Sequence, residues 1–310
     1  MTLPITLRQL QVFEAVVRLK SYTKAARELN LTQPAVSQQV KQLEDHLQTP
    51  LLAHSGRNFQ PTEAGLVVLG HGRAILQELE NLGATLGNLK GLKAGRLRIS
   101  AVTTVNYFAP TLLRSYCQRY PGIDVSVDVA NRQDLLDQLA ESTIDMAIMG
   151  QPPEGLDLDA TAFLENPLVI VAPEGHALAK RKSIPLQELT GEVFLMREQG
   201  SGTRGAMERL FAERGVDITT GVEVSGAEAL KQGVQAGLGL ALTSRHAVQM
   251  ELALGRLVEL NVKGFPIKRA WYLVTRRGKN LSAPAAAFRD FVMAEAAELL
   301  GTPAPKTKKA

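Results

Sequence analysis

Residues 196–204, MREQGSGTR, bring several anion-binding groups together in the sequence. Ser201, Gly202 and Thr203 supply small side chains, N–H groups and two hydroxyls at the start of an expected helix. Arg204 follows them directly. Because a helix N-terminus and a guanidinium group both attract phosphates and carboxylates, the segment indicates an anion site. A capped helix beside a permissive glycine loop is the plainer alternative.

A second polar group comes from Thr103, Thr104 and Asn106, which follow the first strand expected in the larger part of the chain. The next helix is expected to begin there. Ligands of open α/β sheets bind at the carboxyl ends of strands, so we expect this group to face the first one across a cleft.

Catalytic and metal chemistry find no support in the sequence. The anion segment lacks both the GxxxxGK[ST] and the GxGxxG patterns of phosphate-binding loops. A hydrolase with Ser201 as its nucleophile would need a histidine and a carboxylate positioned beside it, and no sequence pattern identifies such residues. Five histidines are scattered without metal-ligand spacing: His46, His54, His71, His176 and His246. We therefore expect a protein that is not an enzyme, with no metal and no cofactor other than a bound effector.

The first 47 residues carry apolar side chains at the spacing of three short helices. Thr32 can cap the third helix, and Pro34 lies in its first turn. The apolar side of the third helix is made by Val36, Val40, Leu43 and Leu47, and its opposite side presents Gln33, Ser37, Gln38 and Lys41. Gln and Ser bind base edges in the major groove, and Lys binds phosphates. A helix-turn-helix is thus indicated, with a solvated three-helix bundle as the alternative.

The segment after the third helix predicts a hairpin and then a long helix. Two short strand-like pieces flank residues 55–56, and Glu63 follows a capping Thr62. The helix carries an apolar stripe over about 28 residues, or about 42 Å at 1.5 Å per residue: Leu66, Leu69, Ile75, Leu76, Leu79, Leu82, Leu86 and Leu89. We favour pairing with a second copy of this helix over packing within the chain.

From residue 96 the pattern becomes an alternation of strands and helices. Strands are expected at 96–102, 123–130, 144–150, 168–173, 193–198, 220–225, 238–243 and 271–276, and helices at 110–120, 132–141, 204–214, 226–236 and 284–300. Repeated strand-helix-strand units favour parallel sheets covered by helices. Two such sheets with a cleft between them would fit the roughly 210 residues.

Length and composition agree with a globular protein of about two domains, because 310 residues exceed the usual size of one. The net charge of +4 is unevenly spread. Residues 1–95 carry 10 Lys and Arg against 7 Asp and Glu, and residues 96–305 carry 22 against 24. The single Cys117 cannot form an internal disulfide, and no apolar run reaches the roughly 18 residues of a membrane span. We expect a cytoplasmic protein without a membrane partner.

The chain resembles the LysR-type transcriptional regulators over essentially its whole length. The resemblance is carried by LRQLQVFEAVVRLKSYTKAARELNLTQPAVSQQVKQLEDHL and the following wing LLAHSGRNFQPTEAG. It implies an α/β protein with an N-terminal winged helix-turn-helix, a linker helix used for dimerisation, and a two-lobed effector domain similar to solute-binding proteins. By position it implies DNA contacts for Gln33, Pro34, Ser37, Gln38 and Arg57. The wing departs from the family pattern at Leu52 and His54, where Phe and Arg are usual.

Within that family the chain is most similar to regulators of Calvin-cycle carbon-fixation operons. The runs ANRQDLLDQL, IDMAIMGQPP and FLMREQGSGTR carry this similarity. It implies an activator of carbon-fixation genes whose effector is a phosphorylated metabolite or NADPH. Asn131, Arg132 and Gln151 follow strands of the same lobe and could complete the effector site, with loop and cap roles as the alternative.

We therefore expect four parts in the chain: a DNA-binding domain at 1–61, a linker and dimerisation helix at 62–92, an effector domain of two lobes at 96–302 and a disordered basic tail at 303–310. Expected partners are double-stranded DNA with an interrupted inverted repeat, a homodimer or homotetramer, and RNA polymerase. The alternatives are a LysR-type regulator of another pathway with a non-phosphorylated effector, and a solute-binding or enzyme domain.

Overall fold

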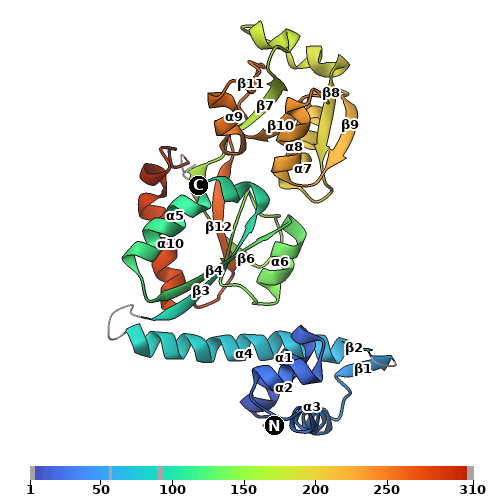
Figure 1. The fold of residues 1–310 in the computed structure, drawn as a ribbon, viewed down its shortest axis with the longest axis vertical. Helices are drawn as coiled ribbons and strands as arrows, with labels where there is room; N and C mark the ends of the chain where they lie inside the picture. Colours follow the sequence, from blue (N-terminus) through green and yellow to red (C-terminus); the bar gives the residue numbers. More distant parts are fainter. Residues whose placement is uncertain (1–3, 56–57, 89–93, 306–310) are drawn as a thin grey trace. The chain divides into compact units, whose positions relative to one another are not determined.

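A computed structural model describes residues 4–55, 58–88 and 94–305 of the chain (Figure 1). The chain divides into two compact units. The first unit contains the elements up to the long helix α4, and the second contains the elements from β3 onward.

Three helices open the first unit: α1 (Leu7–Leu19), α2 (Tyr22–Glu28) and α3 (Gln33–Leu47). Each begins at a hydroxyl residue that accepts a backbone N–H of the first turn: Thr6, Ser21 and Thr32. Pro34 lies in the first turn of α3, where its missing N–H leaves no hydrogen bond unmade. The three helices share one buried core, to which α1 gives Phe13 and α3 gives Val36 and Leu43. The expected helix-turn-helix is therefore present.

A short hairpin, β1 (Leu52–Ser55) and β2 (Asn58–Pro61), follows the helices and leads into α4 (Glu63–Asn88). The Glu44 carboxylate of α3 accepts the backbone N–H groups of Leu51 at 2.7 Å and Leu52 at 3.1 Å, which fixes the start of the hairpin. Gly65 has no side chain at a point where a Cβ atom would overlap the Leu51 carbonyl oxygen. This close approach holds the first turn of α4 against the hairpin.

The second unit consists of two lobes, and the first lobe is built on a five-stranded sheet in the order β4-β3-β5-β12-β6. Its strands are β3 (Gly95–Val102), β4 (Ile123–Ala130), β5 (Met146–Met149), β6 (Leu158–Glu165) and β12 (Ala270–Arg276). The 3₁₀ helix η1 (Thr103–Tyr107) follows β3 directly. The remaining helices of the lobe are α5 (Ala109–Arg119), α6 (Arg132–Ala140) and α10 (Ala283–Leu299).

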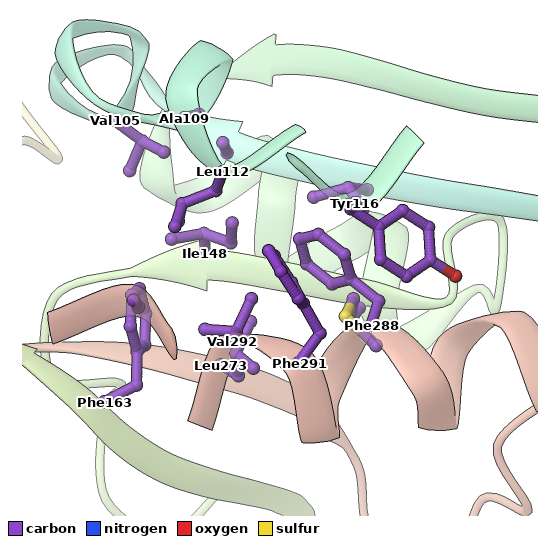
Figure 2. Close-up of a cluster of buried hydrophobic side chains, with 14 of the residues drawn as sticks. Val105, Ala109, Leu112, Tyr116, Ile148, Phe163, Leu273, Phe288, Phe291 and Val292 are labelled. Atoms are coloured by element: carbon purple, nitrogen blue, oxygen red, sulfur yellow. The ribbon is translucent and has the colours of Figure 1, made fainter. Parts of the chain in front are cut away.

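Alternate residues of the sheet contact different helices. Ile148 of β5 packs with α5 and α10 in the larger core, whereas Ala147 and Met149 pack with α6. Figure 2 shows the larger core, where the Tyr116 ring of α5 lies beside Phe288 and Phe291 of α10. Both faces of the sheet are thus covered, which leaves the strand ends as the exposed edge of the lobe.

The second lobe contains a three-stranded sheet, β10-β7-β11, and a two-stranded sheet, β8-β9. The strands are β7 (Leu168–Pro173), β8 (Val193–Arg197), β9 (Thr219–Val224), β10 (Ala241–Ser244) and β11 (Leu257–Glu259), and the helices are α7 (Gly202–Glu213), α8 (Gly226–Gln235) and α9 (Gln249–Ala253). The Leu240 N–H donates to the Val193 carbonyl at 2.8 Å and joins the two sheets. Gly239 permits this contact, because a Cβ atom there would overlap the same carbonyl oxygen.

Two crossovers join the lobes, one between β6 and β7 and one between β11 and β12. The Asn166 N–H donates to the Arg269 carbonyl at 2.7 Å, so the crossovers lie side by side. The expectation of parallel sheets is confirmed for β3 with β4 and β5 and for β8 with β9, but it is wrong for the other strands. Strand β12 runs antiparallel to β5 and β6, and β10 and β11 run antiparallel to β7, because the chain crosses from one lobe to the other and back. Among the described residues, no helix combines the length and apolar character needed to cross a membrane.

Candidate functional site

The outer face of α3 is polar and solvent-exposed. The residues expected to contact DNA are all exposed: Gln33, Pro34, Ser37, Gln38 and Lys41. Asp45 and His46 near the end of α3 are exposed as well. Val36, Val40 and Leu43 are buried on the other face. Within the described part of the chain, the side chains of Gln33, Ser37 and Gln38 make no hydrogen bond, so their donors and acceptors remain available. Arg57 of the wing lies outside the described residues, and His54 is exposed beside the Phe59 ring.

Helix α4 has some apolar residues that are buried in the core of the first unit and others that are exposed. Leu69 packs in the core of the first unit. Ile75, Leu79 and Leu82 are 42%, 41% and 55% exposed, and their spacing places them on one face. Leu66 is also exposed but lies nine residues before Ile75, on a different side of the helix. The expected stripe is therefore divided between a buried part and an exposed part. Leu89 lies outside the described residues, and the Leu86 side chain is not described.

A cleft of about 610 Å³, including its open mouth, lies between the two lobes of the second unit. The first lobe contributes the carboxyl ends of β3, β4 and β5, and the second contributes the end of β8 and the start of α7. Most of the predicted effector residues line it: Thr103, Thr104, Asn131, Arg132, Gln151, Ser201, Gly202 and Thr203.

The start of α7 presents an anion-binding geometry to the cleft. Ser201 is the N-cap, and its Oγ accepts the Arg204 N–H at 3.5 Å. The first N–H groups of a helix have no partner within the helix, so those of Gly202 and Thr203 are available to a ligand. The positive end of the helix dipole and these N–H groups together favour a negatively charged group.

Two arginines give the cleft positive charge. The Arg132 guanidinium donates to the Gln151 carbonyl at 3.0 Å. The Arg269 side chain makes no hydrogen bond or ion pair with any described residue. Burial lowers the pKa of both arginines, and repulsion from Arg209 lowers it further. A half-buried cation without a carboxylate partner is costly, and an anionic ligand would remove that cost.

A third arginine of the cleft is already neutralised. Arg197 is 7% exposed and donates two hydrogen bonds of 2.7 Å to the Glu198 carboxylate and one of 3.3 Å to the Thr103 hydroxyl. Burial alone would raise the pKa of Glu198, but the hydrogen bonds from Arg197 and Gly226 lower it overall. Glu198 therefore remains a carboxylate and neutralises the Arg197 guanidinium group. The hydrogen bond between Arg197 and Thr103 joins the two lobes.

Two predicted effector residues do not line the cleft. Arg204 pairs with Glu208 at 2.8 Å and Glu223 at 2.6 Å, and it also donates to the Arg197 carbonyl at 2.9 Å. These two carboxylates neutralise its charge and turn its side chain away from the start of α7. Asn106 lies on η1 and is exposed.

The cleft also contains residues that the sequence analysis did not single out. The polar ones are Asn166, Arg197, Glu198 and Arg269, and Trp271 supplies a buried aromatic wall. Arg197 and Glu198 belong to the same MREQGSGTR segment and could have been included. Asn166 and Arg269 lie on the crossovers, about a hundred residues apart, and only the fold brings them together. The described residues include no cluster of three or more His, Cys, Asp or Glu side chains suited to a metal ion.

The chain matches known protein families and known regulators along most of its length. Residues 7–66 match the family of bacterial regulatory helix-turn-helix proteins of the lysR type, and residues 90–297 match the LysR substrate binding domain. The RuBisCO operon transcriptional regulator of Allochromatium vinosum is 50% identical over 295 residues, covering 95% of this chain and 98% of the relative. The HTH-type transcriptional regulator CbbR of Rhodospirillum rubrum is 45% identical, covering 94% and 97%.

A solved structure agrees with these matches. The regulatory domain of Synechocystis PCC6803 CcmR, solved in complex with 2-PG, is 41% identical with a TM-score of 0.62. The alignment covers 64% of this chain and 96% of that one. The expected family and fold class are confirmed: the chain belongs to the LysR family of bacterial helix-turn-helix regulators.

Proposed function

We propose that this protein regulates carbon-fixation genes by binding their DNA through α3, and that a phosphorylated metabolite bound in the cleft switches it. The names of the two relatives, a RuBisCO operon regulator and CbbR, support the choice of genes. The CcmR regulatory domain was solved with 2-PG (2-phosphoglycolate), which carries a phosphate and a carboxylate. That ligand supports an anionic effector for this chain.

The observation that carries the proposal is the uncompensated positive charge in the cleft. Arg132 and Arg269 lie there, and no carboxylate in the described part of the chain pairs with them. The N-terminus of α7 faces the same space. We assign the phosphate to these two guanidinium groups together with Ser201 and Thr203. The hydroxyls and amides of the first lobe would hold the rest of the effector: Thr103, Thr104, Asn131 and Gln151.

Calorimetric titration of the full-length protein with 2-phosphoglycolate tests this assignment. Arg269→Gln should weaken binding about 10- to 100-fold, because a charge-assisted hydrogen bond contributes about 1.5–3 kcal/mol. Arg204→Gln is the matched control, since that arginine is already neutralised and lies outside the cleft lining. Equal affinities for Arg269→Gln and the wild type would contradict the assignment.

A parallel titration with NADPH distinguishes the second effector that the family resemblance suggests. NADPH also carries phosphate groups, so it should compete with 2-phosphoglycolate if both use Arg132 and Arg269. A ligand without a phosphate, such as glycolate, should bind much more weakly. Tighter binding of the non-phosphorylated ligand would favour a regulator of another pathway.

We assign dimer formation to the exposed face of α4, and a two-fold dimer of such DNA-binding units favours an interrupted inverted repeat in the DNA. The residues for base reading are Gln33, Ser37 and Gln38, with Lys41 on phosphates, and Pro34 and Arg57 follow from the family resemblance. RNA polymerase is a further partner of an activator bound near a promoter. Pull-down of polymerase by the DNA-bound protein tests this last assignment.

A further inference from the structure

A buried lysine of the second lobe lies against the first lobe, away from the cleft lining. Lys231 of α8 is 7% exposed, and its Nζ pairs with the Glu251 carboxylate at 2.8 Å and with the Glu228 carboxylate at 3.1 Å. Burial alone would lower the pKa of Lys231, but its hydrogen bonds to these two carboxylates raise it overall. Residues of its own lobe therefore hold Lys231 as a cation.

Tyr107, the last residue of η1 in the first lobe, covers this cation. The Lys231 Nζ lies 4.6 Å from the centre of the Tyr107 ring, within the roughly 6 Å of a cation–π contact. The Tyr107 hydroxyl donates to the Glu228 carboxylate at 3.1 Å. A cation–π contact is stronger when the cation has lost its water, as the buried Lys231 has. The ring and the hydroxyl of Tyr107 thus both bind charged groups of the opposite lobe.

The same two elements, η1 and α8, are also connected beside the cleft. At the start of η1, the Thr103 hydroxyl accepts a hydrogen bond from Arg197. Glu198, which neutralises Arg197, accepts the N–H of Gly226 at 3.1 Å, and Gly226 is the first residue of α8. The two elements are therefore joined twice, once at the cleft and once at the buried lysine. A movement of one lobe relative to the other has to break both connections.

We infer that Tyr107, Glu228, Lys231 and Glu251 form a latch that holds the two lobes in the arrangement that forms the cleft. The three charged residues all belong to the second lobe, so releasing Tyr107 leaves their ion pairs intact and frees the lobes from each other. A ligand that contacts both lobes then has to bring them together itself, and its apparent affinity is reduced by the fraction of protein with the lobes together. This consequence for the effector rests on the proposed function, whereas the latch itself does not.

Trp271 reports whether the lobes are together, because it is the only tryptophan in the sequence. It is 3% exposed in the cleft wall, and its Nε1 donates to His246 of the second lobe at 3.5 Å. Acrylamide quenches tryptophan fluorescence by direct contact, so separated lobes quench more. In Tyr107→Leu the population with separated lobes should rise about 2- to 30-fold, the factor for loss of a cation–π contact. The acrylamide quenching constant of the full-length protein should rise with it.

Three further variants separate the parts of the latch. Tyr107→Phe keeps the ring and loses only the hydroxyl, so its quenching should lie between those of the wild type and Tyr107→Leu. Tyr120→Leu is the matched control, a half-buried tyrosine that packs on Tyr116 within the first lobe, and it should quench like the wild type. Lys231→Met combined with Glu251→Gln removes the cation without leaving a buried carboxylate unpaired. This pair should raise the quenching, and adding Tyr107→Leu to it should change little more.

Urea unfolding shows which variants are folded before their quenching is compared, and the Lys231→Met, Glu251→Gln pair carries the test if Tyr107→Leu does not fold. Equal quenching in the folded latch variants and the wild type overturns the inference, and so does an equal rise in Tyr120→Leu.

The link to the effector is tested with 2-phosphoglycolate. A saturating concentration should return the quenching of Tyr107→Leu to near the wild-type value, because the ligand contacts both lobes. If the ligand binds and the extra quenching remains, the inference is wrong and the proposed function stands. If 2-phosphoglycolate does not bind the wild type, the proposed function fails, and quenching without ligand still decides whether the latch exists.

Discussion

At the scale of single residues, arginines in and beside the cleft differ in their neighbours. Arg197 and Arg204 each contact carboxylates, whereas Arg132 and Arg269 contact none among the described residues. The sequence places Arg204 beside the predicted cradle, but its partner Glu223 comes from β9 and only the fold shows that pairing. A guanidinium group binds a ligand well only when the protein has not already neutralised it.

The exposed amide of Gln38 gives a prediction for DNA recognition. Gln38→Ala should weaken binding to a specific operator about 5- to 100-fold, since one base contact contributes about 1–3 kcal/mol. Non-specific binding should hardly change, because it depends on phosphate contacts. Gel-shift titrations on operator and random DNA measure both, with Gln133→Ala on α6 as control. Equal losses on the two DNAs would show that Gln38 does not read bases.

His246 gives a prediction for pH. It is 6% exposed between Phe108 and Trp271, and burial, with a smaller effect from Arg245, lowers its pKa to about 4. The unfolded chain, with a histidine pKa near 6.5, binds the proton more readily, so stability falls as pH drops from about 6.5 to 4. Between pH 7 and pH 5 this group should cost about 2 kcal/mol of unfolding free energy.

Urea unfolding of the full chain at pH 7 and pH 5 measures this loss. His246→Gln should show a smaller drop between the two pH values than the wild type, and the control His71→Gln, an exposed position, should keep the full drop. The same pH dependence in His246→Gln and the wild type would rule out His246 as the source.

At the scale of elements, local signals predicted the DNA-binding unit well. The apolar spacing indicated the three helices, and the expected cap at Thr32 is present at the start of α3. In the second unit the buried strands with near-continuous apolar runs were predicted within a few residues, as at 168–173. Two strands were not predicted: β6, whose first residues are mostly exposed, and β11, which has only three residues. The predicted parallel direction was wrong for β10, β11 and β12, because their direction depends on the two crossovers, which have no local signature.

The exposed face of α4 gives a prediction for assembly. Leu79→Glu places a charge among Ile75 and Leu82, so it should dissociate a dimer that pairs through this face. Analytical ultracentrifugation at micromolar concentration should show the wild type as a dimer or tetramer and the variant as a smaller species. Leu156→Glu, an equally exposed leucine in the second unit, should sediment like the wild type. An unchanged mass for Leu79→Glu would place the contact elsewhere.

At the scale of the whole molecule, the cleft takes residues from both lobes and from the crossovers that join them. Ser201 and Arg197 come from one lobe, Thr103 and Arg132 from the other, and Asn166 and Arg269 from the crossovers. A ligand that contacts all three parts binds one arrangement of the lobes better than others. A ligand can shift the equilibrium between two lobe arrangements only by the difference in its affinity for them. The affinity for DNA changes if the two arrangements also place the DNA-binding units differently.

If the cleft switches DNA binding, the effector and the operator must change each other's affinity by the same factor. Fluorescence anisotropy gives the operator affinity of the full-length protein with and without saturating 2-phosphoglycolate, and calorimetry gives the 2-phosphoglycolate affinity with and without operator. We expect the same factor from both measurements, about 5- to 150-fold, and its loss in Arg269→Gln. An operator affinity that saturating 2-phosphoglycolate leaves unchanged, in a protein that binds this ligand, would contradict the claim that the cleft switches DNA binding.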